Sequence, residues 1–103
     1  MVIVSYARTA LGKAKRGVFR NTPMEDLVAH VFKAVLDKSK IKAELIDDIC
    51  MGNVLAKGAA ATNCRMSQLM AGIPHTTTIH GANRLCSSGL QAVINIVNSI
   101  RAG

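Results

Sequence analysis

The stretch Asn83-Arg84-Leu85-Cys86-Ser87-Ser88-Gly89-Leu90-Gln91-Ala92-Val93 brings a cysteine to the point where an extended run passes into a helix. Residues 76–82 are rich in β-branched side chains, which favour a strand, and residues 87–101 are expected to form a helix that is apolar around most of its circumference. The unpaired N–H groups and partial positive charge of a helix N-terminus favour a thiolate over a thiol. The pattern therefore predicts that Cys86 is a nucleophile, with small residues after it that leave room for a substrate carbonyl.

Further strands and helices are expected upstream of this stretch. Val and Ile at residues 2–8 predict a buried strand, and residues 49–55 predict a second one. Thr22 and Glu25 have the spacing of a capping box, which predicts the start of a helix whose apolar residues recur at helical intervals. Residues 62–71 are expected to form a shorter helix. The order of elements predicts an α/β fold of the form β-α-β-α-β-α, with parallel strands and right-handed crossovers.

Length and composition limit the chain to one small domain, residues 1–103. Half of the residues are hydrophobic and only 3% are aromatic, which suits aliphatic packing better than disorder. No apolar run approaches the roughly 20 residues that a membrane span needs, so no membrane partner is expected. The net charge is +7, but the basic loop at residues 13–20 contains a single aromatic residue and no nucleic-acid motif. We therefore interpret it as a solvated surface and expect no nucleic-acid partner.

The three cysteines form no CxxC pair, which disfavours both a disulfide scaffold and a zinc site, and no metal is expected. Cys50 and Cys64 are interpreted as small buried hydrophobes. Two other residues have structural explanations at this stage. Gly52 is expected to allow a close approach of backbone or a bulge, and Arg65 to form a structural ion pair rather than a substrate contact.

The stretch around Cys86 resembles the active-site signature of the thiolases, enzymes that cleave or form 3-ketoacyl-CoA by passing an acyl group through a cysteine thioester. Other stretches look like the same family in the same order, so the resemblance covers essentially the whole chain, and two of them look most like the peroxisomal 3-ketoacyl-CoA thiolases. The stretches are Ala7-Arg8-Thr9-Ala10-Leu11-Gly12-Lys13-Ala14-Lys15-Arg16-Gly17, Asp48-Ile49-Cys50-Met51-Gly52-Asn53-Val54-Leu55, residues 65–74 around Ala71-Gly72-Ile73-Pro74, and Ile100-Arg101-Ala102-Gly103.

The resemblance implies an acyltransferase of fatty acid β-oxidation, which cleaves 3-ketoacyl-CoA with CoA to acetyl-CoA and a shortened acyl-CoA. Cys86 would carry the acyl group, and its backbone N–H would be half of an oxyanion hole. CoA and acyl-CoA are substrates, and no cofactor is expected. His75 and His80 do not match the family's histidine motifs and receive no role. Leu85 stands where a polar residue is common in the peroxisomal group, which bears on chain-length preference.

Thiolases are several times longer than 103 residues, so this chain is expected to be the first part of the N-terminal half of a thiolase fold, a mixed sheet covered by helices. The catalytic histidines and second cysteine would follow Gly103. With its sheet edges and apolar helix uncovered, the isolated chain is expected to fold poorly or to aggregate.

For the full-length parent, the resemblance implies a homodimer or tetramer in the peroxisome, although the chain shows no targeting signal; a mitochondrial or cytoplasmic location is the alternative. Two other functions remain open. One is an acetoacetyl-CoA thiolase or a related condensing enzyme that works in the biosynthetic direction. The other is a truncated, non-catalytic fragment.

Overall fold

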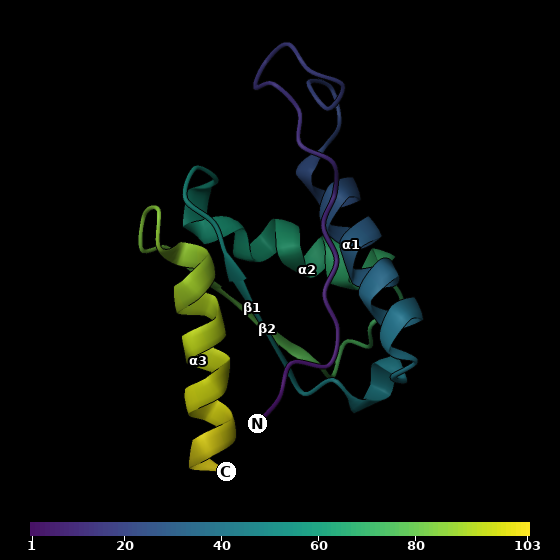
Figure 1. Cartoon of the computed structure of the whole chain (residues 1–103), viewed down its shortest axis with the longest axis vertical. Coiled ribbons are helices and arrows are strands. Elements are labelled where there is room, and N and C mark those ends of the chain that lie inside the picture. The colour runs from purple at the N-terminus through teal and green to yellow at the C-terminus, as the bar shows by residue number, and fades with distance from the viewer.

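A computed structural model describes residues 1–103, and Figure 1 shows the order of their elements. Three helices and two strands alternate along the chain after an N-terminal segment without regular structure. The elements are α1 (Met24–Ser39), the 3₁₀ turn η1 (Ala43–Leu45), β1 (Asp48–Gly52), the 3₁₀ turn η2 (Lys57–Ala60), α2 (Ala61–Met70), β2 (Thr78–Ala82) and α3 (Ser88–Ala102). The expected α/β class is confirmed.

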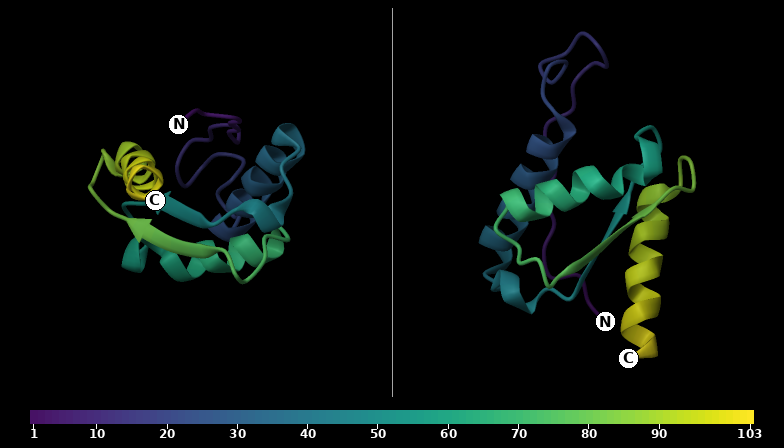
Figure 2. Two further views of the ribbon diagram at one scale, coloured as in Figure 1. Left: turned by 90° about the horizontal axis from the view of Figure 1, so that it is seen from below. Right: turned by 180° about the vertical axis from the view of Figure 1, so that it is seen from behind.

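The two strands are parallel, with Asp48 opposite Thr78 and Gly52 opposite Ala82. Because parallel strands need a crossover, α2 joins the end of β1 to the start of β2. Figure 2 shows α2 on one face of the sheet and α3 on the opposite face, where the N-terminal segment also passes. Both strands end on the side where the chain turns into α3. This arrangement places the loop after β1 beside the turn that precedes α3 (Figure 1).

The strand expected at residues 2–8 is wrong, because these residues pair with no strand. Val2 and Ile3 are 81% and 84% exposed. The segment is held elsewhere: the Lys38 ammonium lies 4.0 Å from the centre of the Tyr6 ring and donates a hydrogen bond to the Tyr6 carbonyl at 3.3 Å. Strand propensity reflects the fit of a side chain to a sheet surface, so β-branched residues with no partner strand stay irregular. The sheet in this chain is consequently parallel only, not mixed.

The helix α1 begins at Met24 with Pro23 at the N-cap, and no side chain caps it, so the expected capping box is wrong. The Glu25 carboxylate instead accepts a hydrogen bond from the Asn63 amide of α2. This hydrogen bond lowers the pKa of Glu25 below its usual value. The Ser67 hydroxyl, also on α2, donates to the Glu25 carbonyl at 3.1 Å. The first turn of α1 is therefore joined to α2 rather than closed on itself.

Only nine of the 103 residues are buried, and four of them are polar. The buried polar groups pair with backbone: Gln68 donates to the Pro74 and Thr77 carbonyls at 2.8 and 3.0 Å, and Thr77 donates to the Ile46 carbonyl at 2.7 Å. The core is thus small and lies where α2 meets the sheet.

The opposite side of the sheet is open. Leu90 and Ile100 of α3 are 66% and 58% exposed. A groove of about 750 Å³, lined almost entirely by apolar side chains, runs between α3, β1 and residues 1–3. The expectation that the apolar helix lacks a covering layer is confirmed, while poor folding of the isolated chain stays a prediction.

Candidate active site

Cys86 lies in the tight turn between β2 and α3, and its side chain is exposed. The sequence predicted Cys86 at the start of the helix. In the structure it precedes the N-cap, Ser87, and so lies just before the first turn of α3. Two backbone hydrogen bonds shape the turn: Ser87 N–H donates to the Arg84 carbonyl at 3.1 Å, and Ser88 N–H donates to the Leu85 carbonyl at 3.0 Å. The turn therefore presents the exposed thiol at the beginning of a helix.

Leu85, immediately before the cysteine, has the left-handed backbone conformation, with φ of 48°. This conformation costs an L-residue about 1–2 kcal/mol, and it persists only where surrounding interactions hold it. Two side chains supply such interactions. The Asn83 side-chain oxygen accepts the Leu85 N–H at 3.1 Å, and the Ser88 hydroxyl donates to the Leu85 carbonyl at 2.6 Å.

The backbone N–H of Cys86 has no hydrogen-bond acceptor, although its neighbours on both sides do. Arg84 N–H donates to the Ser88 hydroxyl at 2.9 Å, Leu85 N–H to Asn83, and Ser87 N–H to the Arg84 carbonyl. This unpaired N–H lies beside the thiol, and such a donor can stabilise an oxyanion that forms when the sulfur attacks a carbonyl.

The thiol opens onto a cleft of about 480 Å³ formed by three parts of the chain. The loop that follows β1 makes one wall, the turn before α3 makes the other, and the start of α1 closes one side. The lining residues are mostly apolar: Met24, Gly52, Asn53, Val54, Leu55, Ala56, Leu85, Cys86, Ser88 and Gly89. An apolar cleft with an exposed thiol and an unpaired N–H beside it can accept an acyl chain that ends in a carbonyl.

Gly52 fixes the distance between the two walls of the cleft. A Cβ atom at this residue would lie 2.6 Å from the backbone carbon and oxygen of Ser88 and 2.7 Å from the nitrogen of Gly89. The expected close approach of backbone is therefore confirmed, and the segment that it touches is the first turn of α3. The end of β1 supports the turn that carries Cys86.

The other two cysteines are removed from this cleft. Cys64 is fully buried in α2, and burial raises the pKa of its thiol. Cys50 lies half-buried in β1, where desolvation raises its thiol pKa and the Asn95 amide donates to the sulfur at 3.6 Å. Both fit the packing role expected for them, although Cys50 is only partly covered. The structure contains no group of three or more His, Cys, Asp or Glu side chains placed to hold a metal ion.

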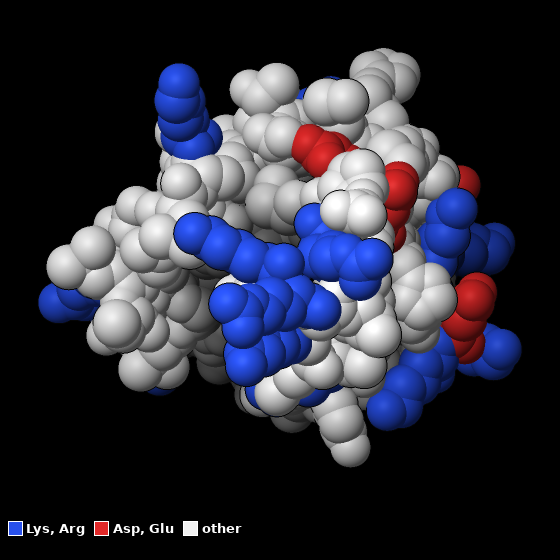
Figure 3. All heavy atoms as spheres, turned by 90° about the horizontal axis from the view of Figure 1, so that it is seen from above, with Lys and Arg blue, Asp and Glu red and all other residues white.

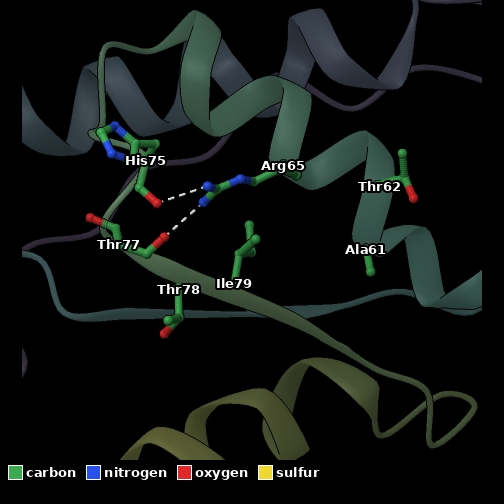
Figure 4. A pocket seen from close by; sticks show the side chains of 7 residues that line it. All are labelled: Ala61, Thr62, Arg65, His75, Thr77, Thr78 and Ile79. Carbon is green, nitrogen blue, oxygen red and sulfur yellow. Dashed lines mark hydrogen bonds between the residues drawn. The ribbon is translucent and has the colours of Figure 1, made fainter.

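The histidines at residues 75 and 80 do not line the Cys86 cleft. His80 projects from β2 towards Asp48, with 3.4 Å between its Nδ1 and a carboxylate oxygen. The His75 carbonyl accepts a hydrogen bond from the Arg65 guanidinium at 2.8 Å, as Figure 4 shows. No histidine of the chain lines the Cys86 cleft.

Arg65 forms no ion pair, so that expectation is wrong, but its role is structural as expected. Its guanidinium also donates to the Thr77 carbonyl at 2.8 Å (Figure 4). A third hydrogen bond runs from the guanidinium to the Gln68 side-chain oxygen at 3.0 Å. These bonds tie α2 to the start of β2 across an open cavity of about 480 Å³. Because the guanidinium is occupied by neutral carbonyl oxygens, it orders the connection between the two elements.

The basic loop forms a compact cluster on the end of the molecule drawn in Figure 3. Its charged side chains are exposed and have no carboxylate within 4.0 Å: Lys13, Lys15, Arg16 and Arg20. This agrees with the solvated surface that the sequence indicated. None of the helices has both the length and the apolar character that crossing a membrane would require.

The chain matches the family model described as the thiolase N-terminal domain over residues 1–103. It is 47% identical to the peroxisomal 3-ketoacyl-CoA thiolase A of Mus musculus over 100% of its own length and 24% of that protein. The chain thus spans about a quarter of the length of the curated relatives that it matches.

Two solved structures of the peroxisomal thiolase of Saccharomyces cerevisiae are similar to it, with TM-scores of 0.92 and 0.93 and identities of 38% and 37%. Each covers 99% of this chain, which corresponds to 27% and 31% of the yeast chains. The first yeast protein is described as dimeric, and the second as five α-β-α-β-α layers built from two core domains of identical topology. The thiolase-like fold and the likeness to the peroxisomal subgroup are both confirmed. The chain belongs to the thiolase family, and all of its residues match that family's N-terminal domain.

Proposed function

We propose that this chain carries the acyl-accepting cysteine of a 3-ketoacyl-CoA thiolase, and that the complete protein cleaves 3-ketoacyl-CoA with CoA. One observation carries the proposal: the exposed Cys86 thiol and its unpaired backbone N–H share an open apolar cleft, in a chain that matches the thiolase N-terminal domain throughout. A nucleophile and an oxyanion donor side by side are what acyl transfer requires.

In this mechanism the Cys86 sulfur attacks the 3-keto carbon, and the carbonyl electrons move to its oxygen. The Cys86 N–H stabilises that oxyanion, with a second donor supplied from outside this chain. The oxyanion then collapses, the bond between C2 and C3 breaks, and protonation of C2 releases acetyl-CoA. The thiol of a second CoA gives its proton to a base from outside this chain and attacks the remaining thioester, which frees a shortened acyl-CoA and the Cys86 thiolate.

The groups that move these protons are not found in the Cys86 cleft, since no histidine and no second cysteine lines it. We therefore propose that the chain by itself is inactive and that the complete protein supplies the base for the thiol and the acid for C2. Its substrates are CoA and acyl-CoA, and it assembles as a homodimer or tetramer. The peroxisomal location of the named relatives supports the same location for this protein.

Intact-protein mass spectrometry of the full-length protein tests the proposal. The protein is exposed to a 3-ketoacyl-CoA without free CoA, so that the acyl-enzyme accumulates. We expect an acyl adduct that disappears in Cys86→Ala and remains in the matched control Cys50→Ala, whose thiol lies outside the cleft. A folded wild-type protein that forms no adduct, or a Cys86→Ala variant that still forms it, would contradict the proposed role.

A further inference from the structure

Ser88 joins both sides of the turn that carries Cys86. Its hydroxyl accepts the Arg84 N–H at 2.9 Å and donates to the Leu85 carbonyl at 2.6 Å. The residue is only 3% exposed, and these two backbone groups take the hydroxyl's single donor and one of its two acceptor lone pairs. From this geometry we infer that Ser88 is a positioning residue for Cys86, a role that rests on the proposed thioester chemistry.

The bridge determines which backbone group remains free beside the thiol. It occupies the Arg84 N–H and one lone pair of the Leu85 carbonyl, while Asn83 occupies the Leu85 N–H. Within residues 84–88, the Cys86 N–H is the one backbone donor left without a partner. Ser88 therefore keeps the turn in the one arrangement that offers this N–H to a substrate oxyanion.

The bridge also holds the left-handed conformation at Leu85, which a leucine does not adopt by preference. The backbone of Ser88 is itself held in place, because the backbone of Gly52 at the end of β1 packs closely against it. The path of rigid contacts runs from the sheet through the backbone of Ser88 to its hydroxyl, and from there to the residues that flank Cys86. Without the hydroxyl, the turn is free to relax and to carry the sulfur and the N–H away from their aligned positions.

The test compares Ser88→Ala, Ser88→Thr and Ser87→Ala in the full-length protein. Ser87 is the matched control because it is the adjacent serine, is exposed, and forms no side-chain hydrogen bond. The rate of acyl-adduct formation is measured over a range of 3-ketoacyl-CoA concentrations and divided by the folded fraction from circular dichroism. A displacement of about 1 Å at a reacting group costs on the order of 100-fold in rate, so Ser88→Ala should lose about this much in maximal rate with little change in KM.

Ser88→Thr keeps the hydroxyl and is expected to restore most of the rate, while Ser87→Ala is expected to match the wild type. A Ser88→Ala variant that acylates as fast as Ser87→Ala overturns the inference. So does a folded Ser88→Thr variant that is as slow as Ser88→Ala, because packing rather than the hydroxyl would then be responsible. If both Ser88 variants unfold, the exposed Asn83→Ala variant replaces them, because it removes the hydrogen bond to the Leu85 N–H in the same turn. A slower acylation rate in Asn83→Ala supports positioning of Cys86 by the turn, and an unchanged acylation rate refutes it.

The two proposals fail in different ways. If the wild-type protein forms no adduct, the thioester function itself is refuted. If the wild type forms the adduct and Ser88→Ala forms it equally fast, the function stands and only the positioning role is lost.

Discussion

A single methyl group added at Gly52 should disturb both stability and catalysis. The new Cβ would lie 2.6 Å from the backbone carbon and oxygen of Ser88, whereas ordinary contact begins at 3.4 Å. One backbone must therefore retreat by about 0.8 Å, because neither neighbour is a flexible side chain that can turn aside. Overpacking of this kind costs roughly 1–3 kcal/mol of unfolding free energy.

The displaced backbone is the first turn of α3, so the change reaches Cys86 through the turn that Ser88 closes. A shift of nearly 1 Å at the nucleophile corresponds to a loss on the order of 100-fold in acylation rate. We expect Gly52→Ala in the full-length protein to show both effects, measured by chemical denaturation and by mass spectrometry of the acyl adduct.

Gly89→Ala is the matched control for stability, because a Cβ at that residue meets no atom within 4 Å. It should leave the protein as stable as the wild type or stabilise it by up to about 1 kcal/mol through better helix propensity. The reasoning is refuted if Gly52→Ala unfolds at the same denaturant concentration as the wild type and forms the adduct at the same rate.

Two other predictions follow from thiol exposure and from a shifted carboxyl pKa. Iodoacetamide should alkylate Cys86 first in the native protein, and the other two cysteines only at higher pH or after unfolding, because burial raises their pKa and reduces their thiolate fraction; peptide mapping that finds equal rates would contradict this. The Asn63 hydrogen bond lowers the pKa of Glu25 in the folded state, so its stabilising effect is present above the usual value of 4.5 and is lost as the pH falls through the folded-state pKa. Asn63→Ala should therefore lower the free energy of unfolding at neutral pH, and this free energy should fall less steeply below pH 4.5 than in the wild type. Urea denaturation at several pH values measures this dependence. A pH dependence equal to that of the wild type would show that Glu25 is not coupled to folding.

The sequence predicted the elements whose signals are local. The helix after Thr22 and the helix after Cys86 follow from apolar spacing, and the strand at 76–82 follows from β-branched residues, of which the structure keeps Thr78–Ala82. The strand at 2–8 failed because a strand needs a partner elsewhere in the chain, and propensity does not contain that information.

The sequence pointed to Cys86 but not to the side chains that support its turn. Glu25 had the local spacing of a capping residue, yet it bonds to Asn63, which is 38 residues away. Ser88 was seen only as a small residue that leaves space, whereas its hydroxyl closes the turn. A signal for this was present, because serine and asparagine near a tight turn readily bond to neighbouring backbone. The left-handed Leu85 carries no such signal, since leucine does not favour that conformation.

The bare apolar side of α3 has a consequence for biosynthesis. These 103 residues correspond to about a quarter of the relatives' length, so most of the synthesis of a protein of that length takes place outside them. At about 5–20 residues per second, that takes tens of seconds, during which the side chains around Leu90 and Ile100 face water. The apolar side of the helix that follows Cys86 therefore stays exposed during synthesis until a later part of the chain covers it, and exposed apolar surface of this kind favours aggregation of the nascent chain.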